Sequence, residues 1–254
     1  MLYSEEWIGN FRFVEYKEWG LEKPATLIVG FPDTGLVGVI GVSYLVSKLG
    51  LDEVGGIDSP YFPPIAVIQN GILRHPIRIF SSKKLGIIYT ELTFTPETSS
   101  ALIPVIVDYA RIKGFDMIIG LTGIAKPNRL DAVELITYYV SSLGKVELLE
   151  KAGAKIFENG VLIGPYALLL KEAMRKRIPT HVLLTESFLE FPDPEAAAIG
   201  LTALSKIIGV EIDVGGLLQQ AEMIRLRAKD LMKRTSQTFS RLGKDLEYSV
   251  PLHM

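Results

Sequence analysis

Two short segments of this sequence carry residue types that could bind a ligand. The first, Gly30-Phe31-Pro32-Asp33-Thr34-Gly35-Leu36-Val37-Gly38, follows an apolar run and opens a helix-like pattern. A glycine-bearing turn at a helix N-terminus can hold a phosphate on free backbone N–H groups, so Gly30, Asp33, Thr34 and Gly35 are candidate ligand-binding residues. Neither G-x-G-x-x-G nor G-x-x-x-x-G-K-[ST] is present, and Pro32 removes one donor. We therefore favour a tight strand-to-helix turn whose glycines allow close packing.

The second segment is Thr122-Gly123-Ile124-Ala125-Lys126-Pro127-Asn128-Arg129, which we predict to be a loop after a strand. Loops at the carboxyl ends of sheet strands are where α/β proteins bind ligands. Lys126 and Arg129 could hold an anion there and are also candidate ligand-binding residues. A solvated loop is the favoured alternative.

No catalytic set can be recognised in the sequence. The three histidines, His75, His181 and His253, are far apart and show no metal-ligand spacing. There is no G-x-S-x-G segment. We predict no catalytic residue, no metal site and no cofactor, and we expect a binding protein more than an enzyme. Distant residues can still assemble a site in the folded chain.

Composition limits the classes of protein further. The 254 residues are 48% hydrophobic and 22% charged, which is typical of a folded chain. The formal net charge of -2 gives no reason to expect nucleic acid or an anionic membrane as partner. The absence of cysteine excludes disulfides, Cys-ligated zinc and thiol nucleophiles. Residues 1–10 do not resemble a signal peptide, and we expect a cytoplasmic protein.

Apolar runs and turn signals predict the elements that would position these segments. Residues 25–30 indicate a buried strand, and Leu36–Leu49, apolar on nearly every face, indicates a helix buried among neighbours or in an interface. Asn70-Gly71 predicts a hairpin, so residues 65–92 should form an antiparallel meander. Asn159-Gly160 gives a second hairpin signal.

Two helices begin with the same cap–proline–acid pattern, at Thr95-Pro96-Glu97 and at Asp193-Pro194-Glu195, and should end at Gly114 and Gly209. A further helix is predicted over 165–177. Strands are predicted over 117–121, 136–140 and 181–185. The predicted fold class is α/β, with a mixed central sheet and helices on both faces.

After Val210 the chain becomes polar and basic. Apolar and small residues recur there at alternating spacings of four and three, which predicts a long helix from about Val214 to Ser240. This helix either packs on its own domain or contacts a partner subunit. We predict an α/β core domain over 1–213, a C-terminal helical extension over 214–246 and a flexible tail over 247–254.

Taken together, three segments resemble the proteasome assembly chaperone family in its archaeal branch. They are GFPDTGLVGVIGVSYLVSKLG (30–50), IDSPYFPP (57–64) with the Asn70-Gly71 hairpin, and DPEAAAIGLTALSKIIGVEID (193–213). The resemblance implies a fold similar to purine nucleoside phosphorylases without their active site. It also implies a homo-oligomeric, chaperone-like scaffold whose partners are proteasome α-subunits or a paralogous chaperone.

Some members of that family dock on the proteasome through a C-terminal tripeptide of the form hydrophobic–Tyr–any. The resemblance therefore points to the chain end as the partner-binding segment, with Tyr248, Leu252, His253 and Met254 as its candidate residues. This chain ends Leu252-His253-Met254, so His stands where the family motif has Tyr. We predict weak or absent docking through the tail. Two other functions stay open: a small-ligand- or nucleotide-binding protein or hydrolase, and a structural partner of a paralogue.

Overall fold

A ten-stranded mixed sheet forms the centre of the molecule in the computed structural model, which describes residues 3–244 and 247–249. The strands lie in the order β1-β2-β4-β7-β8-β3-β9-β13-β10-β11. Their bounds are β1 Ser4–Ile8, β2 Phe11–Glu15, β3 Thr26–Gly30, β4 Asp52–Asp58, β7 Ile77–Ser81, β8 Leu85–Thr90, β9 Met117–Ala125, β10 Thr137–Ser141, β11 Lys155–Ile156 and β13 Thr180–Ser187. The sheet confirms the predicted fold class, and the likeness to purine nucleoside phosphorylases stays a prediction.

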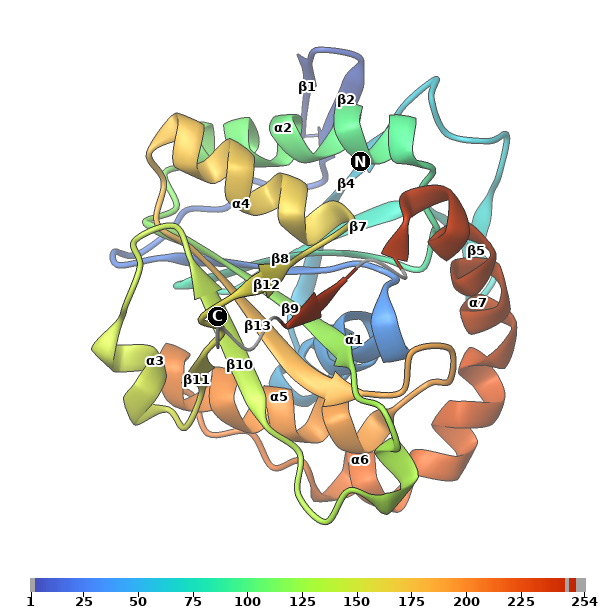
Figure 1. Ribbon diagram of the computed structural model, residues 1–254. Coiled ribbons are helices and arrows are strands. Elements are labelled where there is room, and N and C mark those ends of the chain that lie inside the picture. Colours follow the sequence, from blue (N-terminus) through green and yellow to red (C-terminus); the bar gives the residue numbers. More distant parts are fainter. Residues whose placement is uncertain (1–2, 245–246, 250–254) are drawn as a thin grey trace.

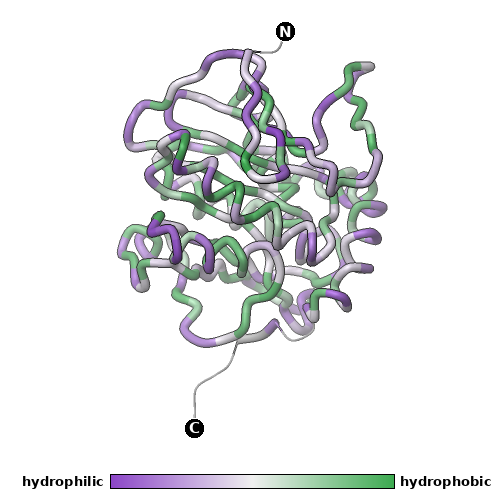
Figure 2. Tube along the Cα trace, turned by 90° about the horizontal axis from the view of Figure 1, so that it is seen from above, coloured by the Kyte–Doolittle hydropathy of each residue, from purple (hydrophilic) through white to green (hydrophobic). Residues whose placement is uncertain are grey.

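Helices cover both faces of this sheet (Figure 1). One face carries α2 and α4, and the other carries α1 and α5 with the short α3 and α6 beside them. Helix α7 runs along one side of the molecule (Figure 1). In Figure 2 the helices change between hydrophobic and hydrophilic colour along their length, as expected of helices with one buried face. The bounds are α1 Val37–Leu49, α2 Pro96–Lys113, α3 Glu147–Lys151, α4 Pro165–Lys176, α5 Pro194–Ile208, α6 Gly215–Gln219 and α7 Ala221–Leu242.

The predicted helix ends are confirmed. The Thr95 side chain accepts a hydrogen bond from the Thr98 N–H at the start of α2, and Asp193 accepts one from Ala196 at the start of α5. Both helices end at a glycine in the left-handed region, Gly114 with φ 81° and Gly209 with φ 66°.

Helix α1 is apolar around its circumference because it is enclosed within the subunit. It lies between strands β3, β8 and β9 on one side and α5 on the other, and its residues from Val37 to Val42 are buried. Of the two predicted environments, burial among neighbours is therefore confirmed. An interface between subunits is not needed to explain this helix.

The meander of residues 65–92 is only partly as predicted. Strands β5 (Val67–Gln69) and β6 (Ile72–Arg74) do pair around Asn70-Gly71, but they form a separate two-stranded ribbon. Pro76 follows that ribbon, and β7 and β8 then join the main sheet. Because proline offers no N–H to a strand ladder, the break at this position has a physical cause.

Two other predictions were wrong. Asn159-Gly160 does not join a hairpin, because β11 pairs with β10 while β12 (Gly160–Val161) pairs with β14 (Tyr248–Ser249). The loop predicted from Thr122 begins four residues later. Residues 122–125 continue β9, since they pair in parallel with the end of β13.

The predicted C-terminal extension contains α6 and α7, and β14, which lies in the predicted tail, pairs with β12. Its inner residues, among them Met232 and Phe239, join the same apolar core as α1 and α5. The boundaries at 213 and 246 remain predictions, and residues 250–254 lie outside the described part. Among the helices of the described residues, none has the length and hydropathy that crossing a bilayer requires.

Candidate functional site

A buried carboxylate marks the carboxyl ends of the central parallel strands. Strands β3, β9 and β13 are parallel neighbours, so their carboxyl ends meet at one edge, where α/β proteins usually bind ligands. Asp33 follows β3 directly and is only 2% exposed. Its Oδ2 atom accepts a hydrogen bond of 3.0 Å from the hydroxyl of Thr122, which stands on β9. The sequence therefore did place a candidate ligand-binding residue at the expected edge.

The partner of Asp33 is a lysine from the far end of the chain. Lys244 follows Gly243, the residue that ends α7, and its ammonium lies 2.9 Å from Oδ1 and 3.0 Å from Oδ2 of Asp33. The same ammonium lies 2.6 Å from Oε2 of Glu247 and donates to the carbonyl oxygen of Ile163 at 3.0 Å. Glu247 in turn accepts a hydrogen bond from the Ile163 N–H. We call Asp33, Thr122, Ile163, Lys244 and Glu247 the lysine cluster.

Burial governs the protonation of the lysine cluster. The side chains of Lys244 and Glu247 are 1% and 3% exposed. Burial disfavours the ammonium, but the carboxylates of Asp33 and Glu247 outweigh this effect and raise the pKa of Lys244. Burial also raises the pKa of Glu247 to about 7, against the attraction of Lys244. Two carboxylates thus share one ammonium, and Glu247 is the group that titrates near neutrality.

The glycine-bearing turn is closed by packing. A Cβ on Gly38 would overlap the carbonyl oxygen of Leu121 and would lie 2.6 Å from the hydroxyl of Tyr166. That hydroxyl already donates to Leu121 O at 2.6 Å and accepts from the Phe31 N–H at 2.9 Å. Gly38 therefore lets the first turn of α1 contact β9 directly, as the packing interpretation of this motif predicts.

Backbone donors of the turn are also engaged. The Gly35 N–H donates to Leu189 O, and the Leu36 N–H donates to Asp33 O. Gly35 has φ 63°, in the region that favours glycine, and a Cβ there would meet Ser187. Thr34 is fully buried. Since these N–H groups already have acceptors, a phosphate could bind here only if the turn reorganised.

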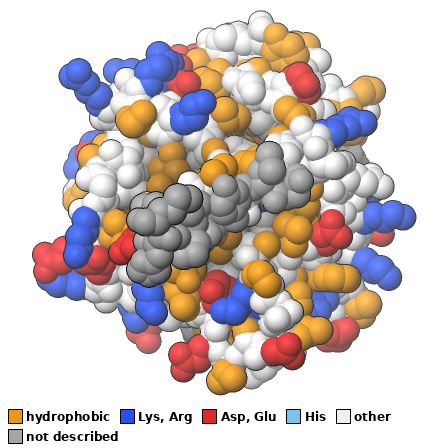
Figure 3. Space-filling view, viewed as in Figure 1, with side chains coloured by type: hydrophobic (Ala, Val, Ile, Leu, Met, Phe, Trp, Pro, Cys, Tyr) orange, Lys and Arg blue, Asp and Glu red, His pale blue; other side chains and the backbone are white. Residues whose placement is uncertain are grey.

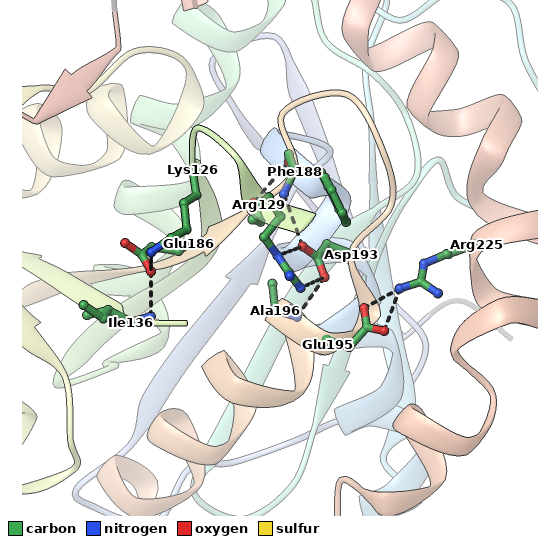
Figure 4. Close-up of polar contacts among 10 residues, drawn as sticks. Lys126, Arg129, Ile136, Glu186, Phe188, Asp193, Glu195, Ala196 and Arg225 are labelled. Atoms are coloured by element: carbon green, nitrogen blue, oxygen red, sulfur yellow. Dashed lines mark hydrogen bonds and ion pairs between the residues drawn. The ribbon is translucent and has the colours of Figure 1, made fainter. Parts of the chain in front are cut away.

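Lys126 and Arg129 are likewise paired with acids (Figure 4). Lys126 lies 2.6 Å from Oε2 of Glu186. Arg129 makes two hydrogen bonds with Asp193, of 2.8 and 3.0 Å, and its guanidinium lies over the ring of Phe188 at 4.9 Å. Asp193 is the residue that caps α5, so Arg129 ties the loop after β9 to the start of that helix.

Several of these residues could be predicted from the sequence, but their pairing could not. The predicted ligand-binding residues lie in two places: Gly30, Asp33, Thr34 and Gly35 at the turn, and Lys126 and Arg129 in the neighbouring loop. Lys244 and Glu247 were missed, because a lysine at the end of a basic helix gives no sign of being buried. Tyr248 lies in β14, whereas Leu252, His253 and Met254 lie outside the described residues.

Among the exposed large apolar side chains of the described residues, two groups are important for binding surfaces. The first is the ribbon β5–β6, where four of them stand out, which we call the ribbon surface: Ile65, Ile68, Ile72 and Leu73. The second is a groove of about 830 Å³ between α7 and the loop before α5, which we call the α7 groove. Leu130, Phe191 and Leu226 line it and are exposed. Figure 3 shows hydrophobic side chains scattered over the viewed face, with charged side chains between them and at its margin. Exposed apolar patches of this kind are typical of protein-binding surfaces.

A mixed sheet between two helical layers, with the Asp33 carboxylate at its strand ends paired to Lys244 of the same chain, defines an α/β protein. The model of the PAC2 family matches residues 27–232. The chain therefore belongs to the PAC2 family.

Comparison with individual proteins agrees with this assignment. PbaA of Pyrococcus furiosus, described as an archaeal homologue of proteasome-assembly chaperone, has a similar structure, with a TM-score of 0.80 and 28% identity over 89% of this chain and 98% of PbaA. PbaB of the same organism, described as an archaeal proteasome activator, shares the fold, with a TM-score of 0.73 and 21% identity over 88% of this chain and 99% of PbaB. A protein of Methanocaldococcus jannaschii is 26% identical over 94% of this chain and 98% of its own length. The resemblance to proteasome assembly chaperones noted from the sequence is confirmed.

Proposed function

We propose that this protein is a chaperone-like binding protein related to proteasome assembly factors, and that it acts in the cytoplasm as a homo-oligomeric scaffold for protein partners. The observation that carries the proposal is membership of the PAC2 family together with the similarity to PbaA along nearly its whole length. Proteasome α-subunits or a paralogous chaperone are the partners that this relationship favours.

The state of the strand ends supports binding over catalysis. Asp33, Lys126 and Arg129 each have an oppositely charged neighbour within 3.0 Å. A general base or an anion-binding cation has to be available to a substrate. These three groups are instead paired with Lys244, Glu186 and Asp193. They hold the fold at the edge where related architectures bind small molecules.

The ribbon surface and the α7 groove support the homo-oligomeric part of the proposal. Helix α1, which suggested an interface from its sequence, is buried within the subunit and no longer does so. Ile68 and Leu73, by contrast, are 62% and 66% exposed and lie opposite each other on the two strands of the ribbon. A projecting apolar element and an apolar groove on one chain can join copies head to tail, which closes into a ring when the rotation allows it.

Light scattering tests the oligomer. We expect a mass several times that of the 254-residue chain at micromolar concentration, and a shift toward the monomer for Ile68→Lys and for Leu226→Lys. Lys171→Glu on the exposed face of α4 is the control and should leave the mass unchanged. A monomeric native chain would contradict the scaffold proposal.

A binding assay with an archaeal proteasome α-ring tests the partner. The native chain should bind weakly, His253→Tyr should bind at least tenfold more tightly, and deletion of 252–254 should abolish binding. An aromatic anchor at an interface is typically worth about 2 kcal/mol or more, which motivates the expected difference. Equal, tight binding by the native and the truncated chains would show that the chain end is not the docking segment.

A further inference from the structure

The lysine cluster is a complete binding site for one ammonium group. A lysine ammonium has three protons to donate. Three acceptor groups surround Nζ of Lys244: the Asp33 carboxylate at 2.9 Å, the Glu247 carboxylate at 2.6 Å and the Ile163 carbonyl at 3.0 Å. The hydroxyl of Thr122 fixes Asp33 from the side. Each proton thus has an acceptor, and the Lys244 side chain is only 1% exposed.

Such a site is unusual for a lysine near the end of a chain. Lysines are rarely fully buried unless they are paired, because removing a charge from water costs several kcal/mol. The other lysines at the end of the molecule, such as Lys229 and Lys233 on α7, are exposed. Only a dedicated set of acceptors justifies the burial of Lys244, and these acceptors come from three separate places in the sequence.

The cluster is also what attaches the end of the chain to the body. Past Gly243 the described chain touches the body through Lys244, through Glu247 and through β14, whose Tyr248 and Ser249 pair with Val161 and Gly160. A two-residue strand pair is weak by itself. The ion cluster immediately before it is the strongest described contact that holds this segment.

We infer that the carboxyl ends of β3 and β9 form a binding site for a primary alkylammonium group, which Lys244 fills in cis, and that filling it latches the C-terminal segment to the body. Opening the latch frees the segment from β12 and exposes the Asp33 carboxylate to an ammonium from outside.

The experiment removes the Lys244 side chain beyond Cβ and supplies the missing alkylammonium group from solution. Lys244→Ala keeps Cβ, so n-propylammonium corresponds to the missing part of the side chain. Hydrogen exchange of the β12 and β14 amides reports latching directly and does not depend on any proteasome component. We expect their protection factors to fall at least tenfold in Lys244→Ala and to recover with propylammonium chloride at tens of millimolar. Sodium chloride at equal ionic strength and neutral n-propanol should not restore them.

Lys233→Ala is the matched control, a lysine-to-alanine change at an exposed site on α7 that should leave the protection factors native with or without the amine. The inference is overturned if Lys244→Ala keeps native protection, or if sodium chloride or propanol restores it as well as the amine does. Should Lys244→Ala fail to fold, Lys244→Met keeps the hydrocarbon and removes the charge. Native protection of β12 and β14 in Lys244→Met would equally refute the latch, and a tenfold loss would support it.

Discussion

The ammonium of Lys244 lies 2.9 Å from Oδ1 of Asp33, a residue 211 positions earlier in the chain. The two side chains are 1% and 3% exposed, so this ion pair is formed in the interior of the protein. Breaking a buried pair from one side is costly because the other charge stays behind without its partner. This relationship leads to the first of four predictions.

Asp33→Ala should lower the free energy of unfolding by roughly 3–5 kcal/mol, because it leaves Lys244 buried with one carboxylate fewer. Denaturation in urea measures the loss. The double variant Asp33→Ala/Lys244→Met should lose less than the sum of the two single variants, since neither uncompensated charge remains. Asp230→Ala, at an exposed position of α7, is the control and should change little. Strict additivity in the double variant would show that the pair contributes nothing.

The attachment of the C-terminal segment should weaken as pH rises through neutrality. Burial raises the pKa of Glu247 to about 7 from its ordinary value of 4.5, so the folded segment binds a proton that the released segment gives up. Protonation of Glu247 therefore stabilises the attached segment fully below about pH 4.5. This contribution to the free energy of attachment decreases by up to about 3 kcal/mol as the pH rises from about 4.5 to 7. Glu247 contacts Lys244 and the Ile163 N–H and faces Asp33, and it lines a cavity of about 520 Å³ together with Lys126, Tyr138 and Glu186.

Hydrogen exchange of the β12 and β14 amides, corrected for intrinsic rates, measures this effect. Between pH 5.5 and 8.5 the protection factors should fall on the order of tenfold in the native chain. Glu247→Gln, which cannot ionise, should give a flat profile. Glu222→Gln, at an exposed position of α7, should behave as the native chain does. A slope that survives in Glu247→Gln would assign the titration to another group.

Gly38→Ala should destabilise the protein by more than about 2 kcal/mol, because the added methyl group overlaps the Leu121 carbonyl in a region without free space. Thermal unfolding is the measurement. Gly20→Ala is the matched control, since nothing lies within 4 Å of the position its Cβ would take. Comparable melting temperatures for the two variants would mean that α1 can move away from β9 at little cost.

Arg129→Met should cost roughly 3 kcal/mol of stability, because it leaves the fully buried Asp193 carboxylate without its bidentate partner. The effect should appear first as faster exchange in the opening turn of α5, which Asp193 caps. Arg227→Met removes an exposed arginine from α7 and should be nearly neutral. Unchanged exchange at Ala196 in Arg129→Met would contradict the structural role given to this arginine.

Local signals in the sequence predicted the parts of the fold that depend on neighbours in the chain. Thr95 and Asp193 predict the starts of their helices because a cap side chain bonds a backbone N–H three residues later. Gly114 and Gly209 predict the helix ends because the left-handed conformation of a single residue is also a local property. The failures concern partners that are distant in sequence. Nothing local distinguishes the turn at Asn70-Gly71, which closes a ribbon, from that at Asn159-Gly160, whose arms pair with β10 and β14.

The same limit applies to the candidate site. The turn at Asp33 and the loop at Lys126 could be placed at the carboxyl ends of strands, because the order of strands and helices predicts that edge. That Lys244 would reach Asp33 and that Arg129 would cap α5 through Asp193 depends on tertiary contacts across long separations. Charge and spacing alone therefore suggested a solvated loop and a basic helix where the structure has buried pairs.

The separation of Asp33 and Lys244 also has a consequence for the order of events during synthesis. Asp33 leaves the ribosome 211 residues before Lys244. While the intervening chain is made, the Asp33 carboxylate has no ammonium from residue 244 to meet. The ion pair can close only after Lys244 has emerged, so a nascent chain interrupted before residue 244 lacks the contact that holds Asp33 in the folded protein.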